Sequence, residues 1–293
     1  MGIKRKTLLI TGVSGLVGGH VLARAAKQYS VTATCHDHPF AWPGVRVRRL
    51  DLESADNIRR CMEETRPRAV IHCAAWSGLD ACEQDPDRCF RVNAEAPGVL
   101  AQSCEAVGSR LVFVSTDMVF DGENAPYDET DETNPVNVYG RAKVEAEKRV
   151  LSACRNAVAA RSALVYGPSV TGGRSFSEWI LERLGKGEEV PLFTDQYRTP
   201  VPVQDLAAAL LELADHFCTG ILHLAGPQRI DRYAFGEALA RARGLDAGLL
   251  RPVSMKDVQY AAPRPVDASL NTKRAVSILH TRFSNIQEGV QKN

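Results

Sequence analysis

Tyr139 and Lys143 are the residues of this 293-residue chain whose types and spacing point most directly to chemistry. They stand four residues apart in the run YGRAK, so on a helix they would project from one face. A tyrosine titrates near pH 10, but an ammonium about 4 Å away, at an effective dielectric near 20, favours its phenolate by about 4 kcal/mol. We therefore expect Lys143 to lower the pKa of Tyr139 by about three units, which suits proton transfer near neutral pH. The alternative is an ordinary amphipathic helix with a buried tyrosine and a solvated lysine.

A hydroxyl group is the third part of this set. Ser115 and Thr116 follow the apolar run that begins at Arg110, and Thr116, or else Ser115, could hydrogen-bond a substrate oxygen beside Tyr139. Hydride transfer to a carbonyl needs such groups, together with a site that holds a nicotinamide cofactor.

A glycine-rich turn near the start of the chain predicts that cofactor site. Gly12, Gly15 and Gly18 follow the apolar run Thr7–Thr11 and open a helical pattern, which is the context that a dinucleotide-binding turn requires. The three glycines permit a tight turn, close approach of a pyrophosphate and close helix–strand packing, and the helix N-terminus favours an anion. We expect the turn to contribute Gly12, Ser14, Gly15, Leu16, Val17 and Gly18 to the cofactor site.

The end of the second strand should discriminate between NADP and NAD. Counting from Gly18 places Cys35 or His36 at the discriminating position, with Asp37 just beyond. An acid there would accept the ribose 2′-hydroxyl of NAD, whereas a basic residue suits the 2′-phosphate of NADP. The lack of a carboxylate at the strand tip favours NADP, and NAD stays the alternative because Asp37 could turn back.

Asp51-Leu52, at the end of the third strand, would contact the adenine amino group. The alternative for Asp51 is a helix cap ahead of Ser54. Asn93 stands inside a helical pattern where asparagine has a poor propensity, and we interpret it as a support residue.

Short apolar runs alternate with helical patterns, which predicts an α/β fold with a doubly wound parallel sheet of Rossmann type. We expect a dinucleotide-binding domain at 1–166 and a smaller substrate-binding portion at 167–293, partly interwoven with it. The predicted strands are Thr7–Thr11, Val31–Cys35, Val45–Leu50, Ala69–Cys73, Arg110–Ser115, Ala157–Ser162 and Gly220–Leu224. The predicted helices are Val17–Gln28, Ala55–Thr65, Asp87–Val107 and Val138–Cys154.

Composition narrows the classes of partner. There are 36 basic and 35 acidic residues, so the net charge of +1 gives no sign of a nucleic-acid or anionic-membrane partner. No apolar stretch approaches the length of a membrane span. The eight cysteines include no Cys-x-x-Cys pair and the seven histidines no cluster, so we expect no metal site and a reducing, cytoplasmic location.

Taken together, these motifs resemble the extended short-chain dehydrogenase/reductase family over nearly the whole chain. The resemblance rests on the glycine turn, Asp51-Leu52, His72-Cys73-Ala74-Ala75 and the Tyr139/Lys143 pair. Within the family, four segments are similar to dTDP-4-dehydrorhamnose reductases; they are 114–122, 135–140, 204–207 and 264–270. The regulatory subunit of methionine adenosyltransferase, a non-catalytic relative, shares much of the pattern.

The resemblance implies a nicotinamide cofactor, a nucleotide-linked keto sugar as substrate, and Thr116, Tyr139 and Lys143 as the catalytic triad. The further cofactor contacts that we expect are His36, Cys73, Ala74, Ala75, Ser115, Tyr139, Lys143 and Leu164, with Lys143 on the nicotinamide ribose. The substrate contacts that we expect are Trp76, Ser77, Thr116, Met118, Arg198 and Arg264. The two arginines are candidates for holding a diphosphate, with a solvated loop arginine as the alternative for each. A homodimer is a further expectation, from the apolar faces near 87–107 and 138–154.

Two departures from the family pattern concern the substrate. Rhamnose-type reductases usually carry a tyrosine where Met118 stands and a tryptophan near Leu164. Trp76 would restore part of the lost aromatic surface, or it is a half-buried loop residue. Three functions stay open: a reductase of a nucleotide-activated 4-keto-6-deoxy sugar, a sugar-nucleotide epimerase or dehydratase, and a cofactor-binding regulatory subunit. Met118 stands where dehydratases typically have glutamate, which argues against dehydration.

Overall fold

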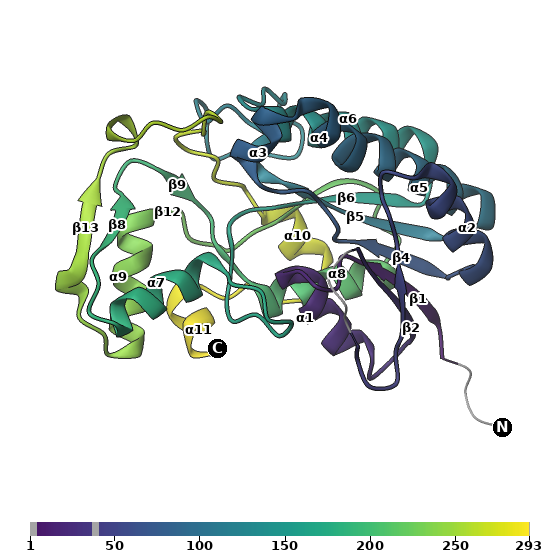
Figure 1. Cartoon of the computed structure of the whole chain (residues 1–293), viewed down its shortest axis with the longest axis horizontal. Helices are drawn as coiled ribbons and strands as arrows, with labels where there is room; N and C mark the ends of the chain where they lie inside the picture. Colours follow the sequence, from purple (N-terminus) through teal and green to yellow (C-terminus); the bar gives the residue numbers. More distant parts are fainter. Residues whose placement is uncertain (1–4, 37–40, 293) are drawn as a thin grey trace.

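The computed structural model describes residues 5–36 and 41–292, and a seven-stranded parallel sheet lies at the centre of this part of the chain (Figure 1). The order of its strands is β11-β6-β5-β4-β1-β2-β3. Their bounds are β1 Thr7–Thr11, β2 Ser30–Cys35, β3 Arg46–Arg49, β4 Ala69–His72, β5 Arg110–Thr116, β6 Ala157–Ser162 and β11 Gly220–Leu224. The order reverses beside β1, which pairs with β2 on one side and β4 on the other. The predicted doubly wound parallel sheet is confirmed.

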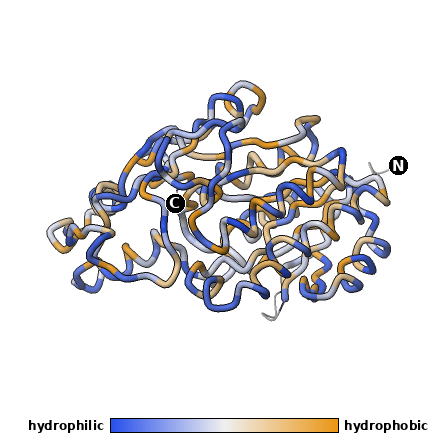
Figure 2. The backbone as a smooth tube through the Cα atoms, turned by 90° about the horizontal axis from the view of Figure 1, so that it is seen from above, coloured by the Kyte–Doolittle hydropathy of each residue, from blue (hydrophilic) through white to orange (hydrophobic). Residues whose placement is uncertain are grey.

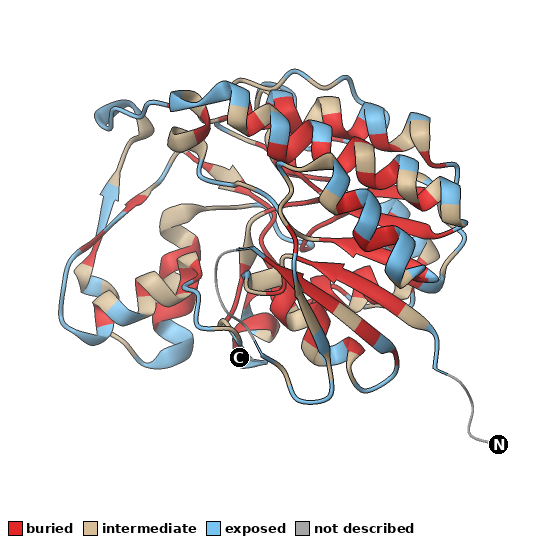
Figure 3. Ribbon diagram, turned by 45° about the vertical axis from the view of Figure 1, so that its right-hand side comes forward, coloured by how far each residue is buried: buried red, intermediate tan, exposed pale blue. Residues whose placement is uncertain are grey.

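Helices cover both faces of the sheet, which explains why its strands are apolar throughout. One face carries α1 (Leu16–Ala25), α8 (Val203–Asp215) and α10 (Lys273–Ile278). The other carries α2 (Ala55–Thr65), α5 (Ala96–Val107) and α6 (Val138–Ala153), with α3 (Leu79–Gln84) and α4 (Pro86–Phe90) at its end. The buried strands lie between helices whose outer sides are exposed (Figure 3), and hydrophilic and hydrophobic residues alternate along those helices (Figure 2).

The apolar residues of strand β1 contribute to the hydrophobic cores on both faces of the sheet. Leu8 and Ile10 point to the face covered by α1 and α8, and Leu9 points to the face covered by α2 and α5. All three are at most 1% exposed. Successive side chains of a strand alternate between faces, so a fully apolar run is needed where both faces are buried.

A smaller lobe lies beside the carboxyl ends of the strands (Figure 1). Its helices are α7 (Phe176–Gly185), α9 (Arg232–Arg243) and α11 (Ile286–Gln291). Its short strands pair as β7 (Val165–Tyr166) with β10 (Val201–Pro202), β8 (Val190–Phe193) with β13 (Leu250–Val253), and β9 (Tyr197–Arg198) with β12 (Ile230–Asp231). Short turns of helix lie at η2 (Asp117–Val119), η3 (Ala247–Leu249) and η4 (Met255–Asp257). Tyr166 and Phe235 are fully buried in the core of this lobe.

The division at residue 166 stays a prediction. Helix α8 and strand β11 both come from 167–293, yet α8 packs against α1 and β11 pairs with β6 in the large sheet. The chain therefore passes between the two lobes more than once.

The predicted helix over Asp87–Val107 is confirmed as one continuous helical segment, which contains an unpredicted π-helical turn. The segment divides into α4, a π-helical turn η1 (Arg91–Glu95) and α5. Pro97, at the start of α5, has no N–H to offer the carbonyl four residues before it, which interrupts the regular ladder at Asn93. The break places Asn93, 1% exposed, where its side chain can serve another segment.

Candidate active site

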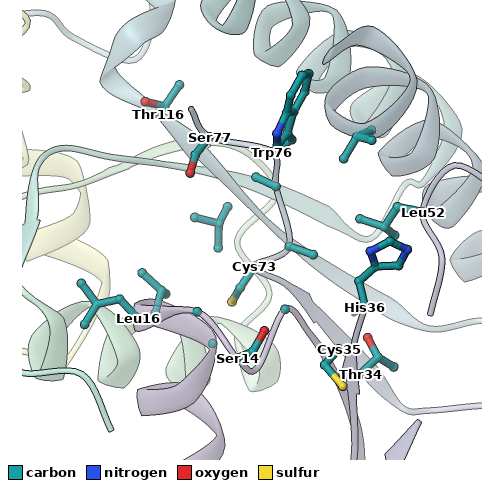
Figure 4. A pocket seen from close by; sticks show the side chains of 18 of the residues that line it. Ser14, Leu16, Thr34, Cys35, His36, Leu52, Cys73, Trp76, Ser77 and Thr116 are labelled. Carbon is teal, nitrogen blue, oxygen red and sulfur yellow. The ribbon is translucent and has the colours of Figure 1, made fainter. Parts of the chain in front are cut away.

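A pocket of about 530 Å³ opens at the carboxyl ends of β1 and β4, where the strand order reverses. This is the position at which doubly wound sheets bind ligands. Figure 4 shows it as an elongated site with Thr116 and Ser77 at one end and His36 and Leu52 at the other. Predicted residues that line it are Gly12, Ser14, Gly15, Leu16, Val17, Gly18, His36, Asp51, Leu52, Cys73, Ala74, Ala75, Trp76, Ser77, Ser115, Thr116 and Tyr139.

The glycine turn has little room for side chains. Gly12 has a φ of +72°, and a Cβ there would meet the backbone of Ala74 at 2.7 Å. A Cβ on Gly18 would collide with the carbonyl oxygen of Gly12, whereas one on Gly15 would sit 3.4 Å from the same oxygen. Gly15 is the N-cap of α1, so the free amides of the first helical turn face the pocket. This arrangement fits the diphosphate of a dinucleotide.

The loop after β7 closes over the same turn. The Thr171 hydroxyl donates to the carbonyl oxygen of Ser14 at 2.9 Å, and the His20 ring lies 2.7 Å from the carbonyl oxygen of Pro168. This loop belongs to the predicted substrate-binding portion, and it also contacts the glycine turn.

At the opposite end of the pocket, Nε2 of His36 lies 3.7 Å from Oδ1 of Asp51. The helix-cap alternative for Asp51 is wrong, because Ser54 caps α2 and the Asp51 carboxylate accepts the amide of Glu53 at 2.9 Å. Asp37, which we considered as a ribose partner, lies outside the described residues.

Trp76 is anchored from both sides, which the sequence did not reveal. The side chain of Asn93 accepts the Trp76 amide and donates to the Trp76 carbonyl, both at 2.9 Å. The guanidinium of Arg88 lies 5.0 Å from the centre of the Trp76 ring and is fixed by Glu53 at 3.0 Å. Arg88 and Glu53 both line the pocket and were not predicted.

Tyr139 lies in the first turn of α6, and its position is set by the cap of that helix. The side chain of Asn137 accepts the amide of Gly140 at 2.8 Å, and Glu83 accepts the amide of Val138 at 2.7 Å. Tyr139 is 9% exposed and packs in a cluster with Cys82 and Cys89.

The expectation that Lys143 lowers the pKa of Tyr139 is wrong for this arrangement. Burial raises the pKa of Tyr139 above its usual value, and the nearby Asp117 carboxylate raises it further. Nζ of Lys143 donates instead to the carbonyl oxygen of Val114 at 2.7 Å and lies 4.0 Å from the centre of the Phe113 ring. Burial lowers the pKa of Lys143 to about 7, so the solvated-lysine alternative is wrong as well. The phenol holds its proton at neutral pH.

The neighbouring hydroxyls of β5 have separate partners. Thr116 donates to Asp117 and accepts the amide of Met118, each at 3.2 Å, while the Ser115 hydroxyl donates to Glu147. Both residues line the pocket. The weak contacts of Thr116 leave it better able than Ser115 to exchange a partner for a substrate oxygen.

Five predicted site residues lie outside the pocket lining: Lys143, Leu164, Met118, Arg198 and Arg264. Met118 packs in the same apolar cluster as Trp76 and Tyr139, so it stays next to the site. Leu164 packs in the core of the smaller lobe instead. Its predicted cofactor contact finds no support in this placement.

The solvated-loop alternative for Arg198 is wrong, because its side chain is 1% exposed. Nε lies 3.3 Å from Asp117, and the guanidinium donates to the carbonyls of Tyr197 and Pro265. The N–H groups of the Arg198 guanidinium already bind these protein partners, so they are not available to a diphosphate. The placement therefore does not support diphosphate binding by Arg198. Its position fixes Asp117 behind Thr116 instead.

Arg264 and a third arginine lie close to this pair. Arg264 contacts Asp80 at 3.1 Å and the Tyr260 ring at 4.4 Å. Arg232, which we did not predict, donates to Gln196 at 2.8 Å, and burial lowers its pKa to about 9. The three arginines come from distant segments, so their proximity could not be read from spacing.

In the described part of the chain, no group of three or more His, Cys, Asp or Glu side chains is arranged to hold a metal ion. Within residues 5–36 and 41–292, no helix combines the length and the apolar character of a membrane span.

Comparison with known proteins identifies the family. A family described as the RmlD substrate binding domain matches residues 6–293. The chain belongs to this family. It is 35% identical over 287 residues to dTDP-4-dehydrorhamnose reductase of Mycobacterium tuberculosis, covering 94% of this chain and 88% of that one. It is 30% identical to methionine adenosyltransferase 2 subunit beta of Bos taurus, covering 94% and 83%.

A solved structure shows the same fold. The dTDP-4-dehydrorhamnose reductase of Bacillus anthracis, in complex with NADP, superposes with a TM-score of 0.87 at 24% identity, covering 98% of each chain. The relatives of this chain thus include proteins named as reductases and proteins named as a subunit of methionine adenosyltransferase. The resemblance drawn from the motifs is confirmed.

Proposed function

We propose that this chain is an NADP-dependent oxidoreductase that reduces a nucleotide-activated 4-keto-6-deoxy sugar, as its relatives named dTDP-4-dehydrorhamnose reductase do. The observation that carries the proposal is one continuous pocket that runs from the glycine turn to Thr116 and Tyr139. A nicotinamide dinucleotide bound there would supply hydride for the ketone carbon.

Different residues around the pocket would bind different parts of the cofactor. The amides at the start of α1 would hold the diphosphate, and His36, with Asp51 beside it, would face the adenosine ribose. NADP is favoured because β2 ends at Cys35 and is followed by His36 rather than by a carboxylate. NAD stays the alternative cofactor.

Tyr139 would donate the proton that the ketone oxygen gains on reduction. Its raised pKa keeps the phenol protonated, and it lines the same pocket as Thr116, which supports this role. Thr116 would orient the carbonyl, and the Lys143 ammonium would bind the nicotinamide ribose of the cofactor. Trp76, Ser77 and Met118 would shape the sugar site.

The substrate diphosphate would be held by Arg264, whose side chain is 16% exposed, rather than by the enclosed Arg198. We keep a cytoplasmic location and a homodimer as predictions. The apolar faces of α5 and α6, from which the dimer was expected, pack on the sheet.

An assay separates this function from a regulatory role. The protein is mixed with NADPH or NADH and a panel of dTDP- and UDP-linked 4-keto sugars, and the loss of nicotinamide absorbance is followed. We expect turnover with a 4-keto-6-deoxy sugar and faster turnover with NADPH. Tight NADPH binding without oxidation by any member of the panel would favour a regulatory subunit, and a strong preference for NADH would overturn the assignment of His36.

A further inference from the structure

A buried carboxylate lies one helical turn beyond Lys143. Tyr139, Lys143 and Glu147 follow each other at intervals of four residues on α6, so they share one face of the helix. Glu147 is 4% exposed, and the reaction proposed above gives it no role. A carboxylate in such a place needs compensating partners.

Two neighbours from the sheet fix this carboxylate. Arg161 of β6 approaches it as a fork, with Nη2 at 2.7 Å from Oε2 and Nε at 3.0 Å from Oε1. Ser115 of β5, which lines the pocket, donates its hydroxyl to the same Oε1. Glu147 therefore connects the catalytic helix to the strand that carries Thr116.

The Lys143 ammonium is held among groups that carry no formal charge. It is 1% exposed, donates to the carbonyl oxygen of Val114 and lies over the Phe113 ring. Burial lowers its pKa to about 7, and Glu147 is the charged group that opposes this shift most strongly. Without Glu147, the ammonium would be left with a carbonyl and an aromatic face.

The other titratable groups around this pair supply little negative charge. His72 and Cys73 of β4 face Lys143, and burial moves their pKa values to about 3 and about 12, which keeps both neutral. Cys89 of α4 also faces Lys143. Behind Arg161 lies His223 of β11, at 3.5 Å, whose pKa burial lowers to about 4.

We propose that Glu147 is a positioning residue of the reductase, which increases the protonated fraction of Lys143 near neutral pH and fixes its helical turn against β5. This inference rests on the proposed function, because it takes the Lys143 ammonium to be the form that acts. Arg161 and Ser115 hold Glu147 in place.

The test is the variant Glu147→Gln, which removes the charge and keeps the shape. The full-length protein is labelled with ¹³C at lysine Cε, and the titration of Lys143 is followed by NMR and assigned with Lys143→Met. We expect Glu147→Gln to lower the Lys143 midpoint by about one pH unit or more, because an opposite charge nearby shifts a pKa by that amount. The alkaline limit of sugar reduction should move down by the same interval.

Glu145→Gln is the matched control. It lies on the same helix and pairs with Arg149 at the surface, so the Lys143 midpoint should stay at its wild-type value. If the single variant fails to fold, the double variant Glu147→Gln/Arg161→Gln replaces it. The double variant removes both partners of the buried ion pair, so it leaves no unpaired guanidinium in the core. We expect the same direction of shift.

An unmoved Lys143 midpoint in a folded Glu147 variant would overturn the inference and leave Glu147 with a structural role alone. The NMR titration needs no turnover. If the wild-type protein reduces no keto sugar while the midpoint still shifts, the proposed function fails and the effect of Glu147 on Lys143 stands.

Discussion

Burial sets the protonation state of Tyr139. Tyr139 lines the pocket from within an apolar cluster, and its raised pKa keeps the proton on the phenol oxygen at neutral pH. Reduction of a ketone requires that form, because the oxygen must gain a proton as the carbon gains hydride.

Replacement of Tyr139 with phenylalanine tests this role. The ring would keep its packing against Cys82 and Cys89, and only the proton donor would be lost. We expect the kcat for reduction to fall by about 10²- to 10⁴-fold, with NADPH affinity nearly unchanged. Steady-state kinetics and a fluorescence titration with NADPH provide the two measurements. Normal turnover of Tyr139→Phe would refute the proton-donor assignment.

At the scale of elements, the turn between β1 and α1 depends on glycines to different degrees. Gly18 packs against the carbonyl of Gly12, so a methyl group there has no space, whereas Gly15 faces the pocket with room for a Cβ. Gly18 therefore contributes to the stability of the fold, and Gly15 to the close approach of the ligand.

We expect Gly18→Ala to lower the free energy of unfolding by about 1–3 kcal/mol, the usual cost of overpacking. Gly15→Ala should unfold close to the wild type yet bind NADPH at least tenfold more weakly, because the methyl group would meet the diphosphate. Urea denaturation and NADPH titration of both variants make the comparison. Equal losses of stability in the two variants would contradict this division.

The strands were predictable because a strand that is buried on both faces is apolar throughout. The ends of β1 and β6 agree with the sequence prediction to the residue. The π-helical turn at Asn93 was not predictable, because it arises from one missing proline N–H inside an otherwise helical pattern. Helix α3 was also missed, since six residues give too little periodicity.

Long-range contacts limited the prediction of the site. The glycine turn and the Tyr139/Lys143 pair are local motifs, and the structure brings the turn and Tyr139 to one pocket. The Arg198–Asp117 pair joins residues far apart in sequence, and the approach of Arg88 to Trp76 depends on how the short helices α3 and α4 fold between and around them. No periodicity or spacing could indicate these contacts, and for that reason Arg198 was expected at a diphosphate.

On the scale of the whole molecule, buried neutral histidines make stability depend on pH. His72 is 1% exposed, its Nδ1 lies 2.7 Å from the Thr11 hydroxyl, and burial lowers its pKa to about 3. The unfolded chain binds a proton at His72 as the pH falls below about 6.5, whereas the folded chain does not. Stability from this group is therefore present above pH 6.5 and is lost progressively toward pH 3.

Between pH 6.5 and 4, we expect His72 to account for a loss of up to about 1.4 kcal/mol per pH unit in the free energy of unfolding. His72→Asn should flatten that dependence, measured by urea denaturation across the range. The exposed His280→Asn is the control and should keep the wild-type slope. An unchanged slope in His72→Asn would contradict the assignment.

The most direct test of the central claim is transfer of the label from [4-²H]NADPH, prepared separately in each C4 stereoisomer, to a dTDP-4-keto-6-deoxy sugar. We predict that one isomer delivers a single deuterium to C4 of the sugar, detected by NMR and mass spectrometry. A product sugar without deuterium from either isomer, or no product at all, would contradict the account.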